Sequence, residues 1–347
     1  MKIRIGFWLL MALTNNPVAP FQLRHYMLKI NFLIFGLMIF LLSLTRSLRY
    51  GREAKSFSTP DKKDSLILEK HCCSLKYGPM MVRIDPSVGA RVVSFRWNDD
   101  EFLIQKTTEP DYFGATFWPD PQNKWWPVDS ALDGKPYTII KKDKLNIQLL
   151  GKQSRSGLRF EKFFSLRPGD SSLHIVYKIY NSGKIPLSVG PWELIRTKEG
   201  LVFYPGKLSH SLPRSDLEGV KLKNQMIWYF QGSVKASTDG KLFSYSLAEW
   251  MACAGNKLLF IKSFPFVTSR EVAPGQGTAE IYTNAKRTYL ELETHGKFTK
   301  LQPGGFITYE VSWYLRPLSD NILLKTGSPA LIGYVEQLLG SRRASQK

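Results

Sequence analysis

The sequence has few of the residues from which metal centres and disulfide frameworks are built. Its 347 residues include three cysteines and five histidines. Cys72 and Cys73 are adjacent and Cys253 is remote, so a bridge from Cys253 to one of the other two is the only plausible disulfide. An odd number of cysteines argues against a disulfide framework, and no metal-ligand spacing is present. We therefore expect neither a bound metal nor a cofactor.

Signals for nucleotide chemistry and for nucleic-acid binding are also missing. The chain has no Gly-rich phosphate loop, no nucleophile elbow and no HExxH motif. The formal net charge is +19, but lysine and arginine form no run dense enough for a nucleic-acid-binding stripe. The charge fits a solvated basic surface, and a preference for anionic partners such as acidic glycans or lipid headgroups is the alternative. We expect no nucleic-acid partner.

The sequence has one long apolar run, INFLIFGLMIFLLSL at Ile30 to Leu44. Its fifteen residues are few for a membrane-spanning helix and are typical of the apolar region of a signal peptide. The best cleavage site, at Ser43 to Thr45, is poor, so an uncleaved membrane anchor is the alternative. Met27 opens a signal-like sequence of its own, which leaves Met1 or Met27 as the start. We expect an exported protein, periplasmic or extracellular, or one anchored in the membrane.

Four regions follow from composition. Residues 1–49 are the signal peptide or anchor, and residues 50–64 form a polar, basic linker. Residues 65–317 contain short, strand-like segments bounded by Gly, Pro, Asn, Asp or Ser, which is typical of a sandwich or barrel. Residues 318–347 hold the one convincing helix, Pro329 to Leu339, and a basic tail.

The expected strands include two alternating segments near the start of the domain and many later ones. They are Met80–Ile84, Arg91–Trp97, Phe102–Ile104, Tyr137–Lys141, Leu145–Leu150, Leu158–Leu166, Leu173–Tyr180, Leu187–Val189, Phe243–Leu247, Leu258–Ser263, Ala279–Tyr282, Tyr289–Thr294 and Phe306–Leu315. Aromatic residues make up 13% of the chain, with nine tryptophans. These side chains suit sugar binding, although most of them are expected to fill the core.

Five segments in order resemble a domain-of-unknown-function family within the galactose mutarotase-like (aldose 1-epimerase-like) superfamily. They are DPSVGARVVSF (85–95), FWPDPQNKWWPVD (117–129), GLRFEKFFSL (157–166), YKIYNSGKIPLSVGPWELI (177–195) and YLELETHGKFTKLQPGGFITYEVSWYL (289–315). The resemblance implies an all-β fold, a two-sheet supersandwich whose concave face holds a sugar, here followed by the short C-terminal helix.

The resemblance also implies a general base. Mutarotases carry a carboxylate in a Leu-Glu-Thr context, followed by Pro-Gly and a last strand with Trp, and Glu293 falls on that position. Strand periodicity places Glu291, Glu293 and His295 on one face of their strand. Such a face could equally be the solvated side of an edge strand.

Ring opening also needs an acid, and here the sequence departs from the mutarotase pattern. At the position where mutarotases place a histidine this chain has Trp192, whose indole N–H does not transfer protons near neutral pH. Residues 117–129 contain no histidine and offer Trp118, Gln122 and Trp126, either as a binding loop or as a loop packed on the sandwich.

Three further residues complete the predicted site. Glu193 could replace the lost acid if burial raised its pKa. Arg196 could bind a sugar hydroxyl or carboxylate, or pair with Glu193. Arg91 opens a strand after a turn and is expected to brace it.

Two functions follow from these residues. The first is a non-catalytic carbohydrate-binding protein, with His295 and the residues above around the sugar. The second is an aldose epimerase or mutarotase-like enzyme with Glu293 as base and a rewired acid. The lost histidine favours the first and the retained Glu293 favours the second.

Overall fold

The computed structural model describes residues 65–68, 72–213, 215–233, 238–255, 257–319 and 321–345. The signal peptide or anchor and the linker predicted for residues 1–64 lie outside them. No helix within these ranges is long and apolar enough to cross a membrane. No disulfide joins any two of Cys72, Cys73 and Cys253, all of which the structure describes.

The first of two large antiparallel sheets carries the elements that later form the site. Its strand order is β1–β2–β3–β4–β6–β11–β19–β18–β15, with the short β5 on β4. The bounds are β1 Ser65–Leu68, β2 Cys73–Tyr77, β3 Met80–Asp85, β4 Arg91–Trp97, β5 Asp100–Glu101, β6 Ala115–Asp120, β11 Leu187–Thr197, β15 Gly240–Ser246, β18 Ala279–Thr283 and β19 Leu290–His295.

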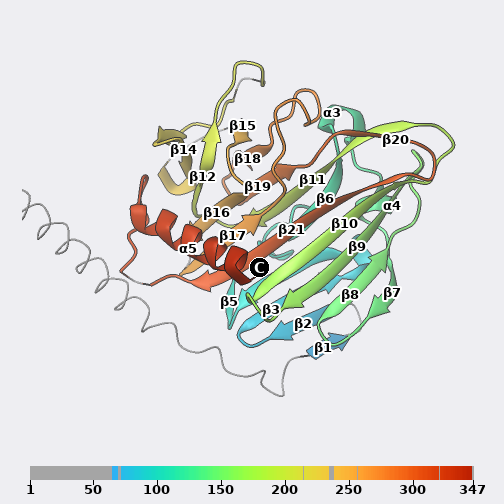
Figure 1. Ribbon diagram of the computed structural model, residues 1–347, viewed down its shortest axis with the longest axis horizontal. Helices are drawn as coiled ribbons and strands as arrows, with labels where there is room; N and C mark the ends of the chain where they lie inside the picture. Colours follow the sequence, from blue (N-terminus) through green and yellow to red (C-terminus); the bar gives the residue numbers. More distant parts are fainter. Residues whose placement is uncertain are drawn as a thin grey trace, which may run out of the picture. The chain divides into compact units, whose positions relative to one another are not determined.

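The second sheet has the order β7–β8–β9–β10–β21–β17–β16–β12–β14–β13 (Figure 1). The bounds are β7 Thr138–Lys142, β8 Asn146–Leu150, β9 Leu158–Arg167, β10 Ser172–Asn181, β12 Leu201–Lys207, β13 Lys221–Lys223, β14 Met226–Phe230, β16 Trp250–Gly255, β17 Leu258–Ser263 and β21 Phe306–Pro317. Pairing of β12 with β15 links the two sheets, and β20, Thr299–Leu301, pairs with β11.

The core lies between the two sheets. Phe95 of the first sheet contacts Phe260 and Trp313 of the second, with ring centroids 6.3 and 5.8 Å apart. Phe117 of β6 stacks on Tyr177 of β10 at 4.0 Å. Alternation along each strand sends one set of side chains into this interface and the other set outward. The predicted sandwich of two stacked antiparallel sheets is therefore confirmed.

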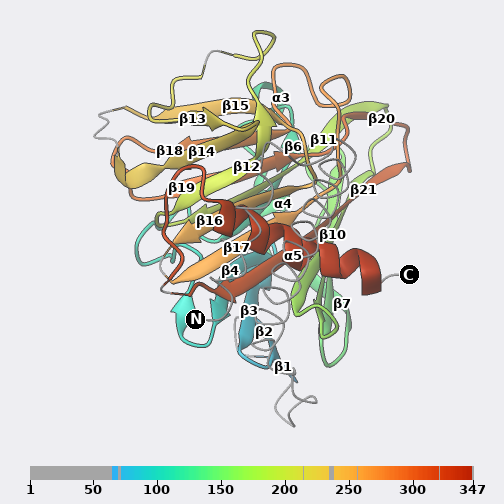
Figure 2. The same cartoon turned by 60° about the vertical axis from the view of Figure 1, so that its left-hand side comes forward.

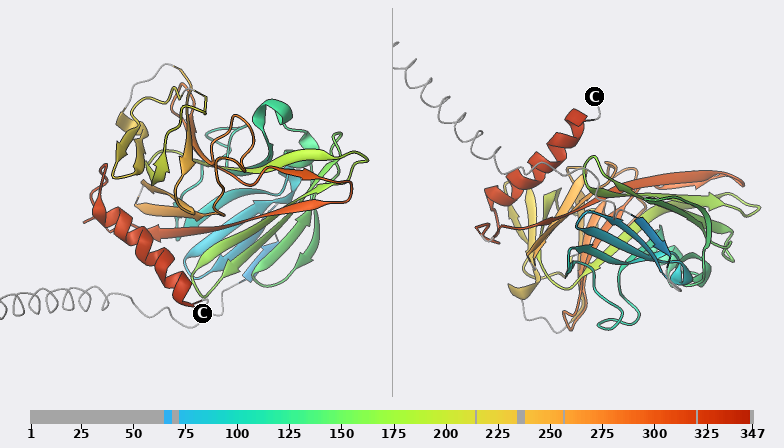
Figure 3. Two further views of the ribbon diagram at one scale, coloured as in Figure 1. Left: turned by 45° about the horizontal axis from the view of Figure 1, so that its top comes forward. Right: turned by 90° about the horizontal axis from the view of Figure 1, so that it is seen from below.

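Helices are few and short except for the last one. The elements are η1 Pro86–Val88, α3 Gln122–Trp125, α4 Ser130–Asp133, η2 Gln231–Ser233 and α5 Pro329–Ser345. Helix α5 begins at Pro329, as predicted, but it ends at Ser345 and not at Leu339. Its Leu331 and Val335 are buried against the strands, and Figures 2 and 3 show the helix lying on the outside of the second sheet.

Candidate functional site

A cavity of about 680 Å³ opens where β6, β11, β19, β18 and β15 run side by side, in the upper part of Figure 1. Six aromatic and eight polar side chains face it. The aromatic ones are Tyr112, Trp118, Trp126, Trp192, Tyr282 and Tyr289; the polar ones are Glu109, Gln122, Asp216, Asp239, Lys241, Asn284, Lys286 and Glu291. Four residues predicted from the sequence, Trp118, Gln122, Trp126 and Trp192, are among them.

Strand register brings distant segments together at this cavity. On β11, Trp192 pairs with Trp118 of β6 on one side and with His295 of β19 on the other. Two residues further on, Leu194 pairs with Glu293. Because side chains alternate along a strand, these residues share the outward face of the first sheet.

The three tryptophan side chains of the cavity contact one another in a chain, and one of the three is exposed. Trp118 lies 5.1 Å from Trp126 and 5.2 Å from Trp192, measured between ring centroids. The Trp118 indole N–H donates to Asp133 Oδ2 at 2.6 Å, and the Trp192 indole N–H donates to Glu293 Oε2 at 2.8 Å. Trp126 is 45% exposed, whereas Trp118 and Trp192 are buried. The group therefore offers a stacking surface that buried hydrogen bonds hold in place.

Arg196 is buried beneath the cavity and does not pair with Glu193. Its Nε donates to Glu291 Oε1 at 2.7 Å, and its Nη1 donates to Thr116 Oγ1 at 3.1 Å. The guanidinium carbon lies 5.3 Å from the centre of the Trp118 ring. Arg196 thus orients Glu291, which is the carboxylate of β19 that faces the cavity.

Glu293 is fully buried and does not face the cavity. Its Oε2 accepts hydrogen bonds from Trp192 and, at 2.9 Å, from the Lys241 ammonium group. Burial raises the pKa of Glu293 to about 7, although Lys241 opposes the shift. β19 lies between β11 and β18, so the alternative of a solvated edge strand is wrong.

His295 is buried behind Trp192, on which its ring stacks at 5.5 Å. Its Nδ1 lies 3.3 Å from Asp120 Oδ2 and its Nε2 lies 3.5 Å from Glu280 Oε1. Burial alone would lower the pKa of His295, but Glu280 and Asp120 outweigh it and raise the pKa to about 10. A histidine held in this way is a cation that supports the site and does not reach the cavity.

Glu280, Glu293 and His295 bring potential metal-ligating atoms within 4.8 Å of one another. The Lys241 ammonium group already lies 2.8 Å from Glu280 Oε2 and 2.9 Å from Glu293 Oε2. Burial lowers the pKa of Lys241, but the two carboxylates outweigh it and the net shift is upward. The Lys241 ammonium group therefore occupies the position in which a metal ion would contact these two carboxylates.

The prediction that Glu193 joins this cleft is wrong. Glu193 alternates with Trp192 and Leu194 on β11, so its side chain lies on the opposite face, between the two sheets. There its Oε2 lies 2.7 Å from the Lys262 ammonium group and its Oε1 accepts from the Tyr177 hydroxyl group at 2.7 Å. Glu193 and Glu293 do not face each other across a cleft, and Glu193 does not line the cavity.

Arg91 does not line the cavity, and it contacts a residue that positions Trp118. Its Nη2 lies 3.1 Å from Asp133 Oδ2, the oxygen that also accepts from Trp118. Asp133 closes the short helix α4, and neither it nor Lys241 was predicted for the site. No local sequence motif marks these residues, because β15 and α4 approach the cavity only through the sheet pairing and the loop that follows β6.

A second cavity of about 900 Å³ lies between α5 and the outer face of the second sheet. Its lining includes His174, Trp250, Phe266, Glu310 and Glu336. None of the site residues predicted from the sequence lines it. The smaller cavity therefore remains the candidate site.

The chain matches one family model, and its fold resembles that of solved structures. A family model described as Domain of unknown function (DUF4380) matches residues 73–316, and no curated protein matches the sequence. Among solved structures, the galactose mutarotase related enzyme from Lactobacillus acidophilus has 12% identity and a TM-score of 0.50, over 74% of this chain and 100% of that chain. This likeness gives the fold, which is galactose mutarotase-like as expected.

Two further solved structures are similar. The galactose mutarotase-like protein from Clostridium acetobutylicum has 9% identity and a TM-score of 0.47, over 74% of this chain and 100% of that chain. The galactose mutarotase-like protein from Lactobacillus casei has 10% identity and a TM-score of 0.48, over 71% of this chain and 100% of that chain.

Proposed function

The chain belongs to the family described as Domain of unknown function (DUF4380), and we propose that it is a non-catalytic carbohydrate-binding protein of the galactose mutarotase-like superfamily. One observation carries the proposal: a cavity of about 680 Å³ is lined by six aromatic and eight polar side chains. Aromatic faces stack on the apolar side of a pyranose, and convergent polar groups bind its hydroxyls.

The polar lining favours a neutral sugar over an acidic one. Four carboxylates face the cavity, those of Glu109, Asp216, Asp239 and Glu291, of which Glu291 is paired with Arg196. The two ammonium groups in the described lining belong to Lys241 and Lys286, and Lys241 is already bound to two buried carboxylates. An anionic glycan, the alternative from the overall charge of the chain, would meet repulsion in this cavity.

Binding relies on rings that are held rigidly. Trp126 offers its half-exposed face, and Trp118 behind it is fixed by Asp133. Trp192 is fixed by Glu293 in the same way. A preorganised surface loses little side-chain entropy when the sugar binds, which increases the affinity gained from each contact.

The alternative, an aldose epimerase with Glu293 as general base, has one observation in its favour. The pKa of Glu293 is raised to about 7, close to the value that suits a general base. Against it, Trp192 and Lys241 separate Glu293 from the cavity, and Glu193 cannot supply the acid. A general base must come within hydrogen-bonding distance of the proton it removes.

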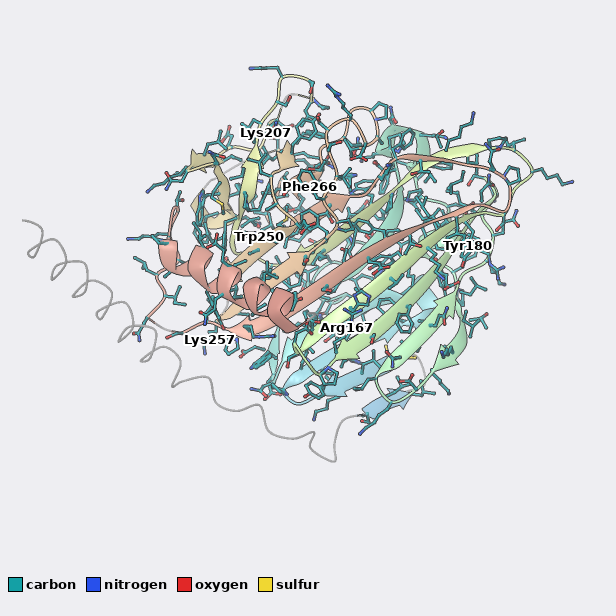
Figure 4. All side chains as sticks on the ribbon, in the orientation of Figure 1. Arg167, Tyr180, Lys207, Trp250, Lys257 and Phe266 are labelled. Atoms are coloured by element: carbon teal, nitrogen blue, oxygen red, sulfur yellow. The ribbon has the colours of Figure 1, made fainter. Side chains whose placement is uncertain are left out.

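Saturation-transfer NMR on the full-length protein tests the proposal with glucose, galactose and N-acetylglucosamine and their short oligomers. We expect saturation transfer to at least one sugar, and loss of most of it in Trp126→Ala. The matched control is Phe306→Ala, an exposed aromatic residue of β21 that packs on Tyr180. Tyr180, which Figure 4 labels, lies near the end of β10. Equal transfer in both variants, or none in the wild type, contradicts the proposal.

Exchange NMR on the same samples separates the two functions. A binding protein leaves the interconversion rate of the two anomers at its spontaneous value. An epimerase raises it, and Glu293→Gln, which keeps the shape of the side chain and removes the base, abolishes the increase. Acceleration in the wild type that Glu293→Gln removes would establish the enzyme.

The N-terminal region leads to a proposal about location. The apolar run and basic linker before residue 65 support export, with the sugar-binding domain outside the cytoplasm or tethered to the membrane. Cell fractionation that finds the full-length protein soluble in the cytoplasm would contradict this.

A further inference from the structure

The aromatic side chains of the cavity form two separate walls. The tryptophan wall is Trp118, Trp126 and Trp192, and the tyrosine wall is Tyr112, Tyr282 and Tyr289. Rings within each wall contact one another, at 5.1 and 5.2 Å in the first and at 6.0 and 6.1 Å in the second. Among the described residues, no ring contact joins the two walls.

Each wall is built in the same way, from one exposed ring and a buried ring behind it. In the tryptophan wall, Trp126 is 45% exposed and rests on Trp118, which is 7% exposed. In the tyrosine wall, Tyr112 is 39% exposed and stacks on Tyr289, which is 4% exposed, with 21° between the ring planes. The exposed rings flank β6 in the chain, because Tyr112 precedes this strand and Trp126 follows it.

Arg196 lies between the walls and sets their separation. Its guanidinium carbon is 5.3 Å from the Trp118 ring centre and 5.7 Å from the Tyr112 ring centre. Glu291, bound to Arg196 at 2.7 Å, presents its carboxylate to the cavity between the walls. The cavity thus has two stacking surfaces with a hydrogen-bond acceptor between them.

Two such surfaces suit a ligand with two rings. A single pyranose stacks on one aromatic face and leaves the other surface to solvent. Two linked pyranoses can occupy both surfaces, while Glu291 accepts hydrogen bonds from hydroxyl groups near the linkage. The polar groups of the lining are spread over both walls, with Gln122 beside the first and Asp239 bonded to Tyr282 in the second.

We propose that the cavity contains two adjacent sugar subsites, one on Trp126 and one on Tyr112, and that its ligand is an oligosaccharide of neutral sugars with at least two rings. The inference rests on the proposed carbohydrate-binding function and specifies its substrate class. It assigns to Tyr112 a contact with the second ring.

Isothermal titration calorimetry on the full-length protein tests this with three series of sugars. The probes are glucose to maltotriose, galactose to galactotriose, and N-acetylglucosamine to triacetylchitotriose. In the series that binds, the disaccharide is expected to bind at least about tenfold more tightly than the monosaccharide, because a second buried aromatic contact adds about 1.4 kcal/mol or more.

The variants Trp126→Ala and Tyr112→Ala identify the subsites. Each should weaken binding of the disaccharide about tenfold, and only one of the two should weaken binding of the monosaccharide. Both side chains are exposed, so neither substitution should unfold the protein, and Phe306→Ala serves as the matched control. Equal affinity for monosaccharide and disaccharide, or a disaccharide affected by only one variant, overturns the two subsites and leaves the binding function intact. No binding in any series overturns both.

Discussion

At the scale of single residues, two glutamates of one strand meet different surroundings. Glu291 and Glu293 lie on the same face of β19, yet Glu291 reaches the cavity and Glu293 lies beneath Trp192 and Lys241. The period of two in a strand predicts the shared face. It contains no information about which neighbouring side chain covers which residue, because Lys241 comes from β15 and is 52 residues away in sequence.

Replacing Lys241 tests the buried charge cluster. Lys241→Met leaves Glu280 and Glu293 without their shared cation, and we expect it to lower the free energy of unfolding by about 3–5 kcal/mol. The control is Lys286→Met, an exposed lysine at the same cavity, with an expected change within about 0.5 kcal/mol. Urea denaturation measures both, and equal effects would refute the role given to Lys241.

The raised pKa of Glu293 predicts how stability depends on pH. The folded protein keeps this proton up to about pH 7, whereas the unfolded chain loses it near the ordinary value of 4.5. The folded state therefore binds more protons in that window, and the free energy of unfolding falls as the pH rises through it, by roughly 1–3 kcal/mol.

Glu293→Gln removes this contribution and should flatten the dependence. Urea denaturation at about pH 5 and about pH 7.5 compares the wild type with the variant. The raised pKa of His295 contributes stability that is fully present below its ordinary pKa of 6.5 and is lost as the pH rises towards about 10, in both proteins. An identical slope in the two proteins below neutral pH would contradict the assignment.

At the scale of elements, the least predictable segment is the one that builds the tryptophan wall. Residues 117–129, which are rich in tryptophan and proline, were interpreted as a loop, but they begin inside β6 and continue into α3. β6 forms because β11 pairs with it along six residues, a tertiary contact that overrides local propensity. β11 was predicted only for Leu187–Val189 and runs to Thr197 for the same reason.

Some strands were missed and others were found with their true bounds. Leu258–Ser263 is β17 as predicted, since its apolar run is bounded by turn residues. β12, β14 and β16 were not predicted. Their residues are nearly all buried, and continuous apolar runs do not show the alternation that identifies a half-buried strand.

Replacing Gly114 by alanine tests how closely the chain before β6 approaches β4. It has a φ of +64°, and a Cβ there would lie 2.3 Å from the Val92 carbonyl oxygen. Gly304 has a φ of +77° but no heavy atom within 4 Å of such a Cβ. Gly304→Ala should therefore lower stability by about 1 kcal/mol through backbone strain alone.

Gly114→Ala adds overpacking to the same strain, and we expect about 1–3 kcal/mol more destabilisation than for Gly304→Ala. Thermal denaturation of the two variants compares them directly. If the two glycines tolerate alanine equally well, β6 and β4 do not approach as closely as described.

At the scale of the whole molecule, a charged pair in the core joins the two sheets. Glu193 of β11 and Lys262 of β17 are both fully buried, and their charged groups lie 2.7 Å apart. Sequence reasoning predicted the sandwich from its strand rhythm and the family from its motifs. It could not predict this pair, since partners in opposite sheets are set only when the sheets are stacked.

Glu193→Gln should therefore affect stability and leave sugar binding unchanged. Loss of one member of a buried pair is expected to destabilise the protein by about 3–5 kcal/mol, and adding Lys262→Met should recover much of that loss. Urea denaturation measures stability, and calorimetry under conditions where the variant is folded measures sugar affinity. A weaker sugar affinity in the folded variant would show that Glu193 contributes to the binding site.

A glycan-array screen of the full-length protein beside Trp126→Ala and Phe306→Ala tests carbohydrate binding at the cavity directly. We expect wild type and Phe306→Ala to bind the same set of neutral glycans of two or more rings, and Trp126→Ala to lose most of this binding. A wild type that binds no glycan, or a Trp126→Ala variant that binds as the wild type does, would contradict this expectation.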